Sequence, residues 1–263
     1  MSTVIYPSPI FGPVHSRRLG VSLGINLMPS DGKICSFDCI YCECGLNASH
    51  RPTLPRPMRQ QVSAALEAQL QKMAAEGVLP DVLTFAGNGE PTAHPDFASI
   101  IGDTIARRDR YCPQAKVSVL SNATMLGRQH VHDALMLVDN NIQKLDTIDP
   151  TYINKVNRPA GRSYDVDRVI DWLKQFEGHV IVQTMFMKGT ANIGGEVFSV
   201  DNTGDRFVEP WLHALADIKP SQVMIYTIDR ETPINGLLKA SREELDAIRD
   251  RVIAQGIDCT ASY

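Results

Sequence analysis

The feature that most constrains this chain of 263 residues is a cysteine triplet, Cys35, Cys39 and Cys42, within the stretch Cys-Ser-Phe-Asp-Cys-Ile-Tyr-Cys. The spacing C-x3-C-x2-C places three thiols on one loop, directly after a segment with the pattern of a strand. Packing alone has no use for three clustered thiols, because a buried free cysteine acts only as a small apolar side chain. The triplet therefore predicts a metal site around which the rest of the chain is arranged.

The number of cysteines indicates which metal is favoured. A structural zinc site has four closed ligands, and Cys44, with one residue between it and Cys42, would strain shared ligation of a single tetrahedral ion. Iron–sulfur clusters are normally held by four cysteine thiolates, so three ligands leave one iron of a 4Fe–4S cluster open. An open position is what separates a catalytic metal site from a structural one. The triplet favours a catalytic 4Fe–4S cluster, with zinc as the alternative.

Composition places the chain among ordinary globular proteins. Apolar residues make up 43% and charged residues 21%, close to globular averages. No apolar run approaches the roughly 20 residues that span a bilayer, and the first seven residues lack the basic start and apolar core of a secretion signal. Six cysteines, three of them in one loop, favour metal in a reducing cytosol over disulfides. We therefore expect a cytoplasmic protein with no membrane segment.

Charge is distributed unevenly along the chain. The net charge is -4, yet residues 1–60 carry six Lys or Arg against three acids. A cationic rim near the triplet is compatible with an anionic substrate such as RNA or a phosphate. A solvated basic face with no ligand explains the same pattern, and we favour it slightly.

The triplet with Tyr41 before its third cysteine, C-x3-C-x-aromatic-C, resembles the signature of the radical S-adenosylmethionine (radical SAM) superfamily. The resemblance implies that Cys35, Cys39 and Cys42 bind a 4Fe–4S cluster, that S-adenosylmethionine (SAM) chelates the open iron, and that Tyr41 belongs to the cofactor site. It also implies that an electron from the cluster cleaves SAM to methionine and a 5'-deoxyadenosyl radical, which abstracts hydrogen from a substrate. The protein then orients the cofactor and excludes competing reactions.

The order of strands and helices predicts the fold class. Strand, loop and helix alternate about six times between residues 19 and 255, which argues for an α/β fold with a parallel sheet wrapped by helices. We expect strands at 19–28, 82–86, 116–120, 142–146, 180–187 and 222–228, and helices at 58–77, 97–108, 127–138, 148–157, 164–176, 207–218 and 242–255. Six units agree with the partial (β/α)6 barrel that the resemblance implies, although a flat doubly wound sheet would give nearly the same pattern.

We expect a single radical SAM domain over residues 1–263, with its core at about 19–228. Pro-rich residues 1–18 are expected to be irregular, and extensions at 1–18 and 229–263 to help close the barrel. The Gly- and Asn-rich stretch 188–204 is predicted to be a long loop of the kind that covers active sites.

A second motif, Gly87-Asn88-Gly89-Glu90, follows the second expected strand. It resembles the GGE motif of the superfamily, which implies that its backbone and Glu90 bind the methionyl ammonium of SAM. Glycines let a backbone approach a ligand, and a carboxylate suits an ammonium. Asn88 interrupts the usual glycine doublet, and a Gly-Asn-Gly turn is otherwise ordinary turn chemistry.

Polar residues also end the next three strands. Ser121 and Asn122 end the third, where related enzymes place groups for the ribose or carboxylate of SAM, although Ser-Asn is common in turns. Lys144 and Asp146 alternate at the end of the fourth, so both are expected to face the barrel interior. They are either a structural ion pair or the candidate catalytic groups that contact SAM or substrate. Gln183 on the fifth strand is a weaker cofactor-binding candidate.

Further motifs indicate a branch of the superfamily. Residues 11–20, Gly89 to Thr92, Lys144 to Asp146 and Asn157-Arg158-Pro159 resemble the iron–sulfur oxidoreductases that are compared with tRNA wyosine-base synthetases. Those synthetases carry further cysteines upstream, and this chain has none before Cys35. The short length also resembles activases that install a radical on a partner protein.

Three functions remain open at this point. The first is a radical SAM enzyme that acts on a small molecule or a nucleotide such as a tRNA base. The second is an activase whose substrate is a partner protein. The third is a non-catalytic zinc or iron–sulfur protein. Both enzymes require an external one-electron reductant such as flavodoxin or ferredoxin. Cys112 and Cys259 are expected to be small apolar side chains, whereas Cys44 is placed to guard or tune the cluster.

Overall fold

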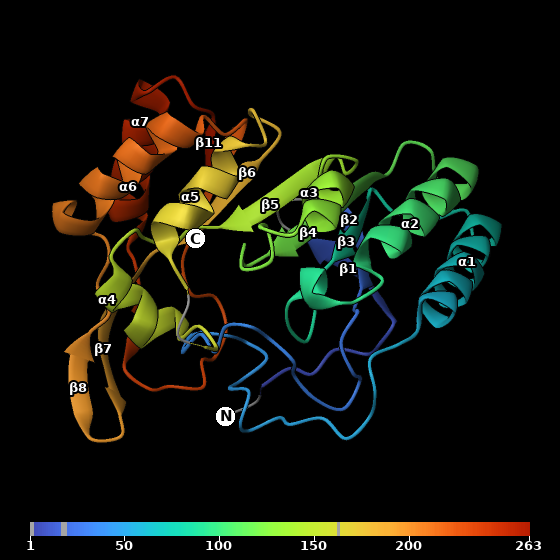
Figure 1. Cartoon of the computed structure of the whole chain (residues 1–263), viewed down its shortest axis with the longest axis horizontal. Helices are drawn as coiled ribbons and strands as arrows, with labels where there is room; N and C mark the ends of the chain where they lie inside the picture. The colour runs from blue at the N-terminus through green and yellow to red at the C-terminus, as the bar shows by residue number, and fades with distance from the viewer. Residues whose placement is uncertain (1–2, 17–19, 162–163) are drawn as a thin grey trace.

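The computed structural model describes residues 3–16, 20–161 and 164–263 (Figure 1). Within them the main sheet has eight strands in the order β1-β2-β3-β4-β5-β6-β9-β11. The strands are β1 (Ile10–Ser16), β2 (Gly20–Ile25), β3 (Val82–Phe85), β4 (Lys116–Ser121), β5 (Asn140–Lys144), β6 (Ile181–Met185), β9 (Gln222–Tyr226) and β11 (Cys259–Ser262). Only β1 is antiparallel to its neighbour in this sheet; all other described pairs are parallel.

The strand order distinguishes the two expected architectures. A doubly wound sheet reverses its strand order at a switch point, whereas here the parallel strands follow one another across the sheet in chain order. The predicted α/β fold with a parallel sheet is therefore confirmed, in its open-barrel form. Helices fill the connections: α1 (Arg59–Ala75), α2 (Phe97–Tyr111), α3 (Gln129–Leu135), α4 (Pro150–Tyr152) with the π-helix η2 (Ile153–Asn157), α5 (Val166–Lys174), α6 (Asp205–Ile218), α7 (Arg242–Ala254), and the 3-10 turn η1 (Pro91–Ala93).

The two faces of the sheet differ in chemistry. Leu23, Leu83 and Val117 lie side by side in register and belong to the main apolar core, which the helices cover. On the other face, Ser118 and Asn140 are in register and share a hydrogen bond of 2.8 Å from the Asn140 amide to the Ser118 hydroxyl. Strand residues alternate between faces with a period of two, so the barrel has an apolar outer layer and a partly polar interior.

Two expectations about the irregular segments were wrong. Residues 10–16 form β1, because an edge strand tolerates the proline that a central strand excludes. Residues 188–204 contain β7 (Met187–Ile193) and β8 (Glu196–Ser199), a hairpin that pairs with β10 (Leu237–Lys239). Gly194 and Gly195, both at positive φ, make its two-residue turn, as hairpin turns require. In the C-terminal extension, β11 adds a seventh parallel strand beside β9.

Other differences concern boundaries. The fourth expected strand starts at Asn140 and ends at Lys144, so Asp146 lies beyond β5. The first expected strand begins at residue 19, which lies outside the described residues. Arg17 and Arg18, which belong to the motif at residues 11–20, also lie outside them. Across the described ranges, no helix has both the length and the apolar character that crossing a membrane would need.

Candidate metal and cofactor site

The cysteine loop, residues 26–58 between β2 and α1, crosses the carboxyl ends of the next three strands. After β3, the Ile34 N–H donates to the Asn88 carbonyl at 3.0 Å, and Ile34 forms an isolated β-bridge with Gly89. After β4, the Asn122 amide donates to the Ser36 hydroxyl at 2.9 Å. These contacts hold the loop over the barrel end, where parallel barrels carry their active sites.

The segment 156–160 holds the opposite side of the same loop. The Ile40 N–H donates to the Val156 carbonyl at 3.0 Å, the Asp38 N–H to the Asn157 carbonyl at 2.9 Å, and the Ala160 N–H to a loop carbonyl at 2.7 Å. Arg158 has left-handed backbone geometry, with φ of 51°. The Asn-Arg-Pro motif thus serves as the second backbone support of the cysteine loop, a role the sequence did not reveal.

The three cysteines face polar donors within the protein. The Asn122 amide lies 3.5 Å from the Cys35 sulfur, and the Asn157 amide lies 3.7 Å from the Cys39 sulfur. Burial raises the pKa of Cys35, and burial also raises the pKa of Cys39 to about 11 against the opposing charge of Lys144.

Cys42 differs from the other two thiols. A hydrogen bond from the Cys44 thiol lowers the pKa of Cys42 to about 6, with burial opposing and the nearby Lys33 ammonium assisting. Cys44 is itself buried, and its sulfur lies 3.4 Å from the Gly87 carbonyl oxygen. A guarding or tuning role for Cys44 remains a prediction.

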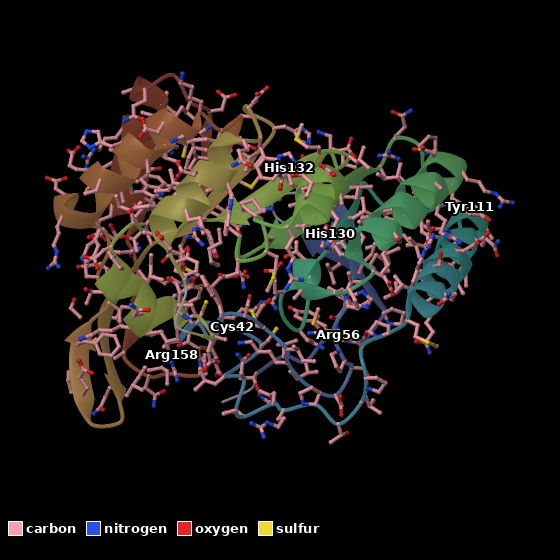
Figure 2. All side chains as sticks on the ribbon, in the orientation of Figure 1. Cys42, Arg56, Tyr111, His130, His132 and Arg158 are labelled. Atoms are coloured by element: carbon pink, nitrogen blue, oxygen red, sulfur yellow. The ribbon has the colours of Figure 1, made fainter. Side chains whose placement is uncertain are left out.

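The residues present fit a thiolate-bound metal cluster by their donor chemistry. All three thiols act electrostatically on one buried ammonium, that of Lys33, so they share one neighbourhood. Among the residues that the structure describes, no His, Cys, Asp or Glu side chains form a group of three or more that could hold a metal ion. The cluster ligands therefore remain a prediction. Figure 2 places His130 and His132 on α3, away from Cys42.

The Gly87–Glu90 motif turns out to support the cysteine loop. A Cβ on Gly89, whose φ is +146°, would lie 1.8 Å from the Ile34 carbonyl oxygen. The Asn88 side chain is buried and uses its amide on protein partners: it accepts from the Tyr6 N–H at 2.8 Å and donates to the Tyr6 and Pro29 carbonyls at 2.9 Å. Because Gly89 has no side chain, the backbone of the cysteine loop at Ile34 can approach it closely. The Asn88 side chain holds the N-terminal segment at Tyr6.

Glu90 joins the ends of β3 and β4. Its carboxylate is 2% exposed and accepts from the Thr92 N–H at 3.0 Å, the Thr92 hydroxyl, and the Asn122 N–H at 2.6 Å. Burial raises the pKa of Glu90, whereas these bonds and one from Ser121 oppose the shift. A carboxylate has about four acceptor sites, so the protein itself engages them in this structure. Binding of an ammonium by Glu90 remains a prediction.

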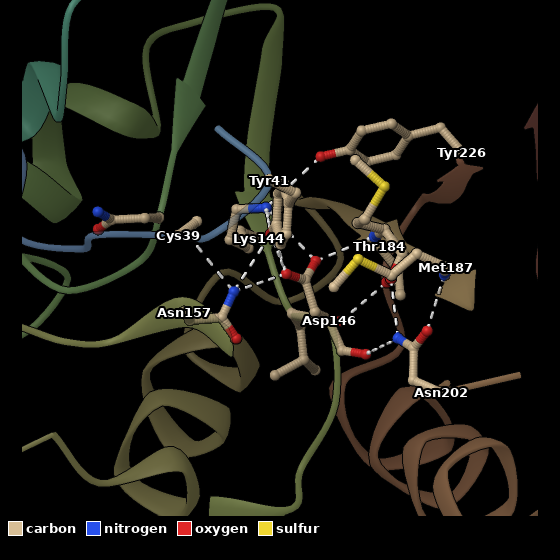
Figure 3. A network of polar contacts seen from close by, with 12 residues as sticks. Cys39, Tyr41, Lys144, Asp146, Asn157, Thr184, Met187, Asn202 and Tyr226 are labelled. Carbon is tan, nitrogen blue, oxygen red and sulfur yellow. Dashed lines mark hydrogen bonds and ion pairs between the residues drawn. The ribbon is translucent and has the colours of Figure 1, made fainter. Parts of the chain in front are cut away.

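Lys144 and Asp146 meet in the network of Figure 3. The Lys144 ammonium lies 3.4 Å from the Asp146 carboxylate and 2.8 Å from the Tyr41 hydroxyl, which itself donates to Asp146. Asn157 donates to Asp146 at 2.8 Å as well as to Cys39. The network therefore links the triplet to the polar barrel interior.

Burial lowers the pKa of Lys144, but the Asp146 carboxylate and neighbouring phenol and thiol groups outweigh it, so the net pKa is raised. Lys144 thus stays an ammonium at neutral pH. Gln183 is its buried in-register neighbour on β6. The sequence patterns predicted that Lys144, Asp146 and Tyr41 lie at the cofactor site. They gave no signal for a role of Asn157 or Lys33.

Comparisons with known proteins agree with this geometry. The family model described as the radical SAM superfamily matches residues 30–192. A UPF0026 protein of Helicobacter pylori is 31% identical over 188 residues, covering 70% of this chain and 58% of the relative. A UPF0026 protein of Methanocaldococcus jannaschii is 30% identical over 184 residues, covering 67% and 53%. The chain therefore spans a little over half the length of these two relatives.

Solved structures show the same fold. A radical SAM methyltransferase from Sphaerobacter thermophilus superposes with a TM-score of 0.64 at 14% identity, covering 92% of this chain and 66% of that one. A structure of TYW1 with a lysine–pyruvate adduct gives 0.59 at 11% identity, covering 89% and 73%. At these identities the likeness shows the fold alone.

The contact at Gly89 yields a stability prediction. Gly89→Ala should lower the free energy of unfolding by more than about 1 kcal/mol, because the methyl group meets the Ile34 carbonyl at a positive φ that only glycine adopts easily. Urea denaturation of the two proteins measures the change. Gly102→Ala is the matched control, since a Cβ there meets nothing within 4 Å. Equal midpoints for Gly89→Ala and wild type would contradict the close approach.

Proposed function

Because the chain belongs to the radical SAM superfamily, whose enzymes use a 4Fe–4S cluster and SAM, we propose that Cys35, Cys39 and Cys42 hold a site-differentiated cluster that cleaves SAM reductively. The observation that carries the proposal is the cysteine loop itself, held on both sides by backbone hydrogen bonds over the carboxyl ends of β3 to β5. When bound, the cluster and SAM supply a 5'-deoxyadenosyl radical that abstracts hydrogen from a substrate.

The chain's own residues have distinct tasks in this proposal. The supports at Gly89 and at 156–158 fix the loop before any cofactor binds, which lowers the entropic cost of ligation. Tyr41, Ser121, Asn122, Gln183 and the Gly87–Glu90 segment are proposed to face SAM. Its binding by Glu90 would require SAM to displace one of the donors that engage this carboxylate in the structure.

Lys144 and Asp146 are the proposed catalytic pair. The raised pKa of Lys144 keeps it charged, so it would act as a fixed cation and hydrogen-bond donor toward SAM or substrate. A neutral amine nucleophile is disfavoured for the same reason. We propose a small molecule or a nucleotide, including a tRNA base, as the substrate. The excess of basic residues in 1–60 is compatible with an anionic substrate, although a solvated basic face explains the same pattern.

The remaining partners follow from the chemistry. An external one-electron reductant of the flavodoxin or ferredoxin class would supply the electron, and a reducing compartment such as the cytosol would keep the thiols free. A partner-protein substrate is the second candidate. A non-catalytic zinc or iron–sulfur protein is the third, and the four-ligand preference of zinc disfavours its zinc form.

Removal of one cysteine ligand tests the cluster assignment. Cys35→Ala, Cys39→Ala and Cys42→Ala should each abolish SAM cleavage, because the cluster loses a thiolate ligand. The assay is 5'-deoxyadenosine formation after anaerobic reconstitution with iron and sulfide, followed by dithionite and SAM. Cys112→Ala is the control, since Cys112 is buried in the apolar core away from the loop and should retain turnover. Full turnover by any triplet variant would show that the ligands are wrong.

Isotope transfer separates the substrate classes. Deuterated pools of RNA, protein or metabolites, each offered with SAM and reductant, should pass deuterium into 5'-deoxyadenosine only from the class that contains the substrate. We expect transfer from RNA or metabolites. Transfer from protein alone would favour the activase instead.

A further inference from the structure

Lys33 is a lysine buried against the cysteine loop. Its side chain is 3% exposed, and its ammonium donates to the Gly45 carbonyl at 2.6 Å. Its backbone N–H is held by the His50 carbonyl at 2.7 Å. Lysine is almost never fully buried unless its charge is paired. The position of this charge therefore requires an explanation.

No carboxylate supplies the pairing within the described residues, since none of the ion pairs found there involves Lys33. The Gly45 carbonyl is neutral. The other groups that act on the ammonium are the thiols of Cys42, Cys35 and Cys39. Burial lowers the pKa of Lys33, but these three thiols outweigh burial and the net pKa is raised. A buried charge is stable only when paired, and thiols become negative when they ligate a metal. The natural counter-ion of Lys33 is therefore the ligated triplet.

Two sulfurs of the triplet have amide donors from different parts of the fold. Cys35 faces the Asn122 amide after β4, and Cys39 faces the Asn157 amide at the end of η2. Full positive charges act on two of the thiols: Lys33 lowers the pKa of Cys42, and Lys144 opposes the rise in the pKa of Cys39. The reduction potential of an iron–sulfur cluster depends on its net charge, on hydrogen bonds to its sulfurs and on exposure. Reduction adds negative charge, which a nearby buried cation stabilises.

We propose that Lys33 is a positioning residue whose buried ammonium, aided by the Asn122 and Asn157 amides, balances the charge of the cysteine ligands and raises the reduction potential of the cluster. This inference rests on the proposed function, because it presupposes that the triplet ligates iron. It assigns a task to a residue outside the cysteine signature. Its consequence is that a weaker biological reductant can deliver the electron.

The test compares substitutions of Lys33 in the reconstituted protein. Lys33→Met removes the charge at similar length, Lys33→Gln keeps an N–H donor for the Gly45 carbonyl but no charge, and Lys33→Arg keeps the charge. Lys188→Met is the matched control, because Lys188 pairs with Glu244. The readouts are iron and sulfide content and the midpoint potential from an EPR-monitored redox titration without SAM.

We expect Lys33→Met and Lys33→Gln to reduce the equilibrium constant for cluster reduction at least tenfold, which is about 59 mV for a one-electron couple. Lys33→Arg should shift it less, and Lys188→Met not at all. If both neutral variants fold by circular dichroism yet lose iron that Lys33→Arg retains, the charge is required for ligation, which also supports the proposal.

Wild-type potentials in the neutral variants, with full iron content, would overturn the inference and leave the proposed function intact. A drop in potential for Lys33→Met but not for Lys33→Gln would also overturn it, since the hydrogen bond to Gly45 would then matter and the charge would not. Failure of the wild-type protein to bind a 4Fe–4S cluster would refute the proposed function, and this inference with it.

Discussion

The backbone clamp on the cysteine loop is the constraint on which the rest of the site depends. One side of the clamp is the Ile34 contact with the Asn88–Gly89 segment, and the other is the set of bonds from Asp38 and Ile40 to 156–157. Without the clamp the cysteine loop would sample many conformations, and ordering its backbone costs about 1–2 kcal/mol per residue. Because the clamp uses backbone groups, it needs glycine at position 89 and a left-handed residue at Arg158.

The charges around the clamp are balanced in pairs that reach across the fold. Lys144 pairs with Asp146, and Arg230 pairs with Glu43 at 2.7 Å and bonds to the Tyr6 hydroxyl. The contacts of Arg230 connect the segment after β9 to Glu43 of the cysteine loop and to Tyr6 of the N-terminal segment. These contacts join side chains far apart in sequence, and a role of both extensions in closing the barrel remains a prediction. Lys33 is unusual in this setting because, within the described residues, its buried ammonium bonds to a neutral carbonyl and pairs with no carboxylate.

Features that depend on local sequence patterns were predicted well, whereas contacts between residues far apart in sequence were not. Alternating apolar residues and turn signals located the strands β3, β4 and β9 closely, and the spacing of Cys35, Cys39 and Cys42 indicated the chemistry. The hairpin β7–β8 was missed although Gly194-Gly195 is a strong turn signal, because the glycines were taken as evidence of a loop. The partners of Cys39 could not be predicted, since Asn157 is 118 residues away and its amide carries no sequence signal of its own.

The central claim is that three cysteines leave one iron of a cluster open for SAM. Mössbauer spectroscopy of the protein reconstituted with iron-57, recorded with and without SAM, tests it most directly. We expect a 4Fe–4S spectrum in which SAM changes the signal of a single iron site and leaves the other three unchanged. A spectrum that is indifferent to SAM, or a protein that takes up zinc and no iron under the same conditions, would contradict it.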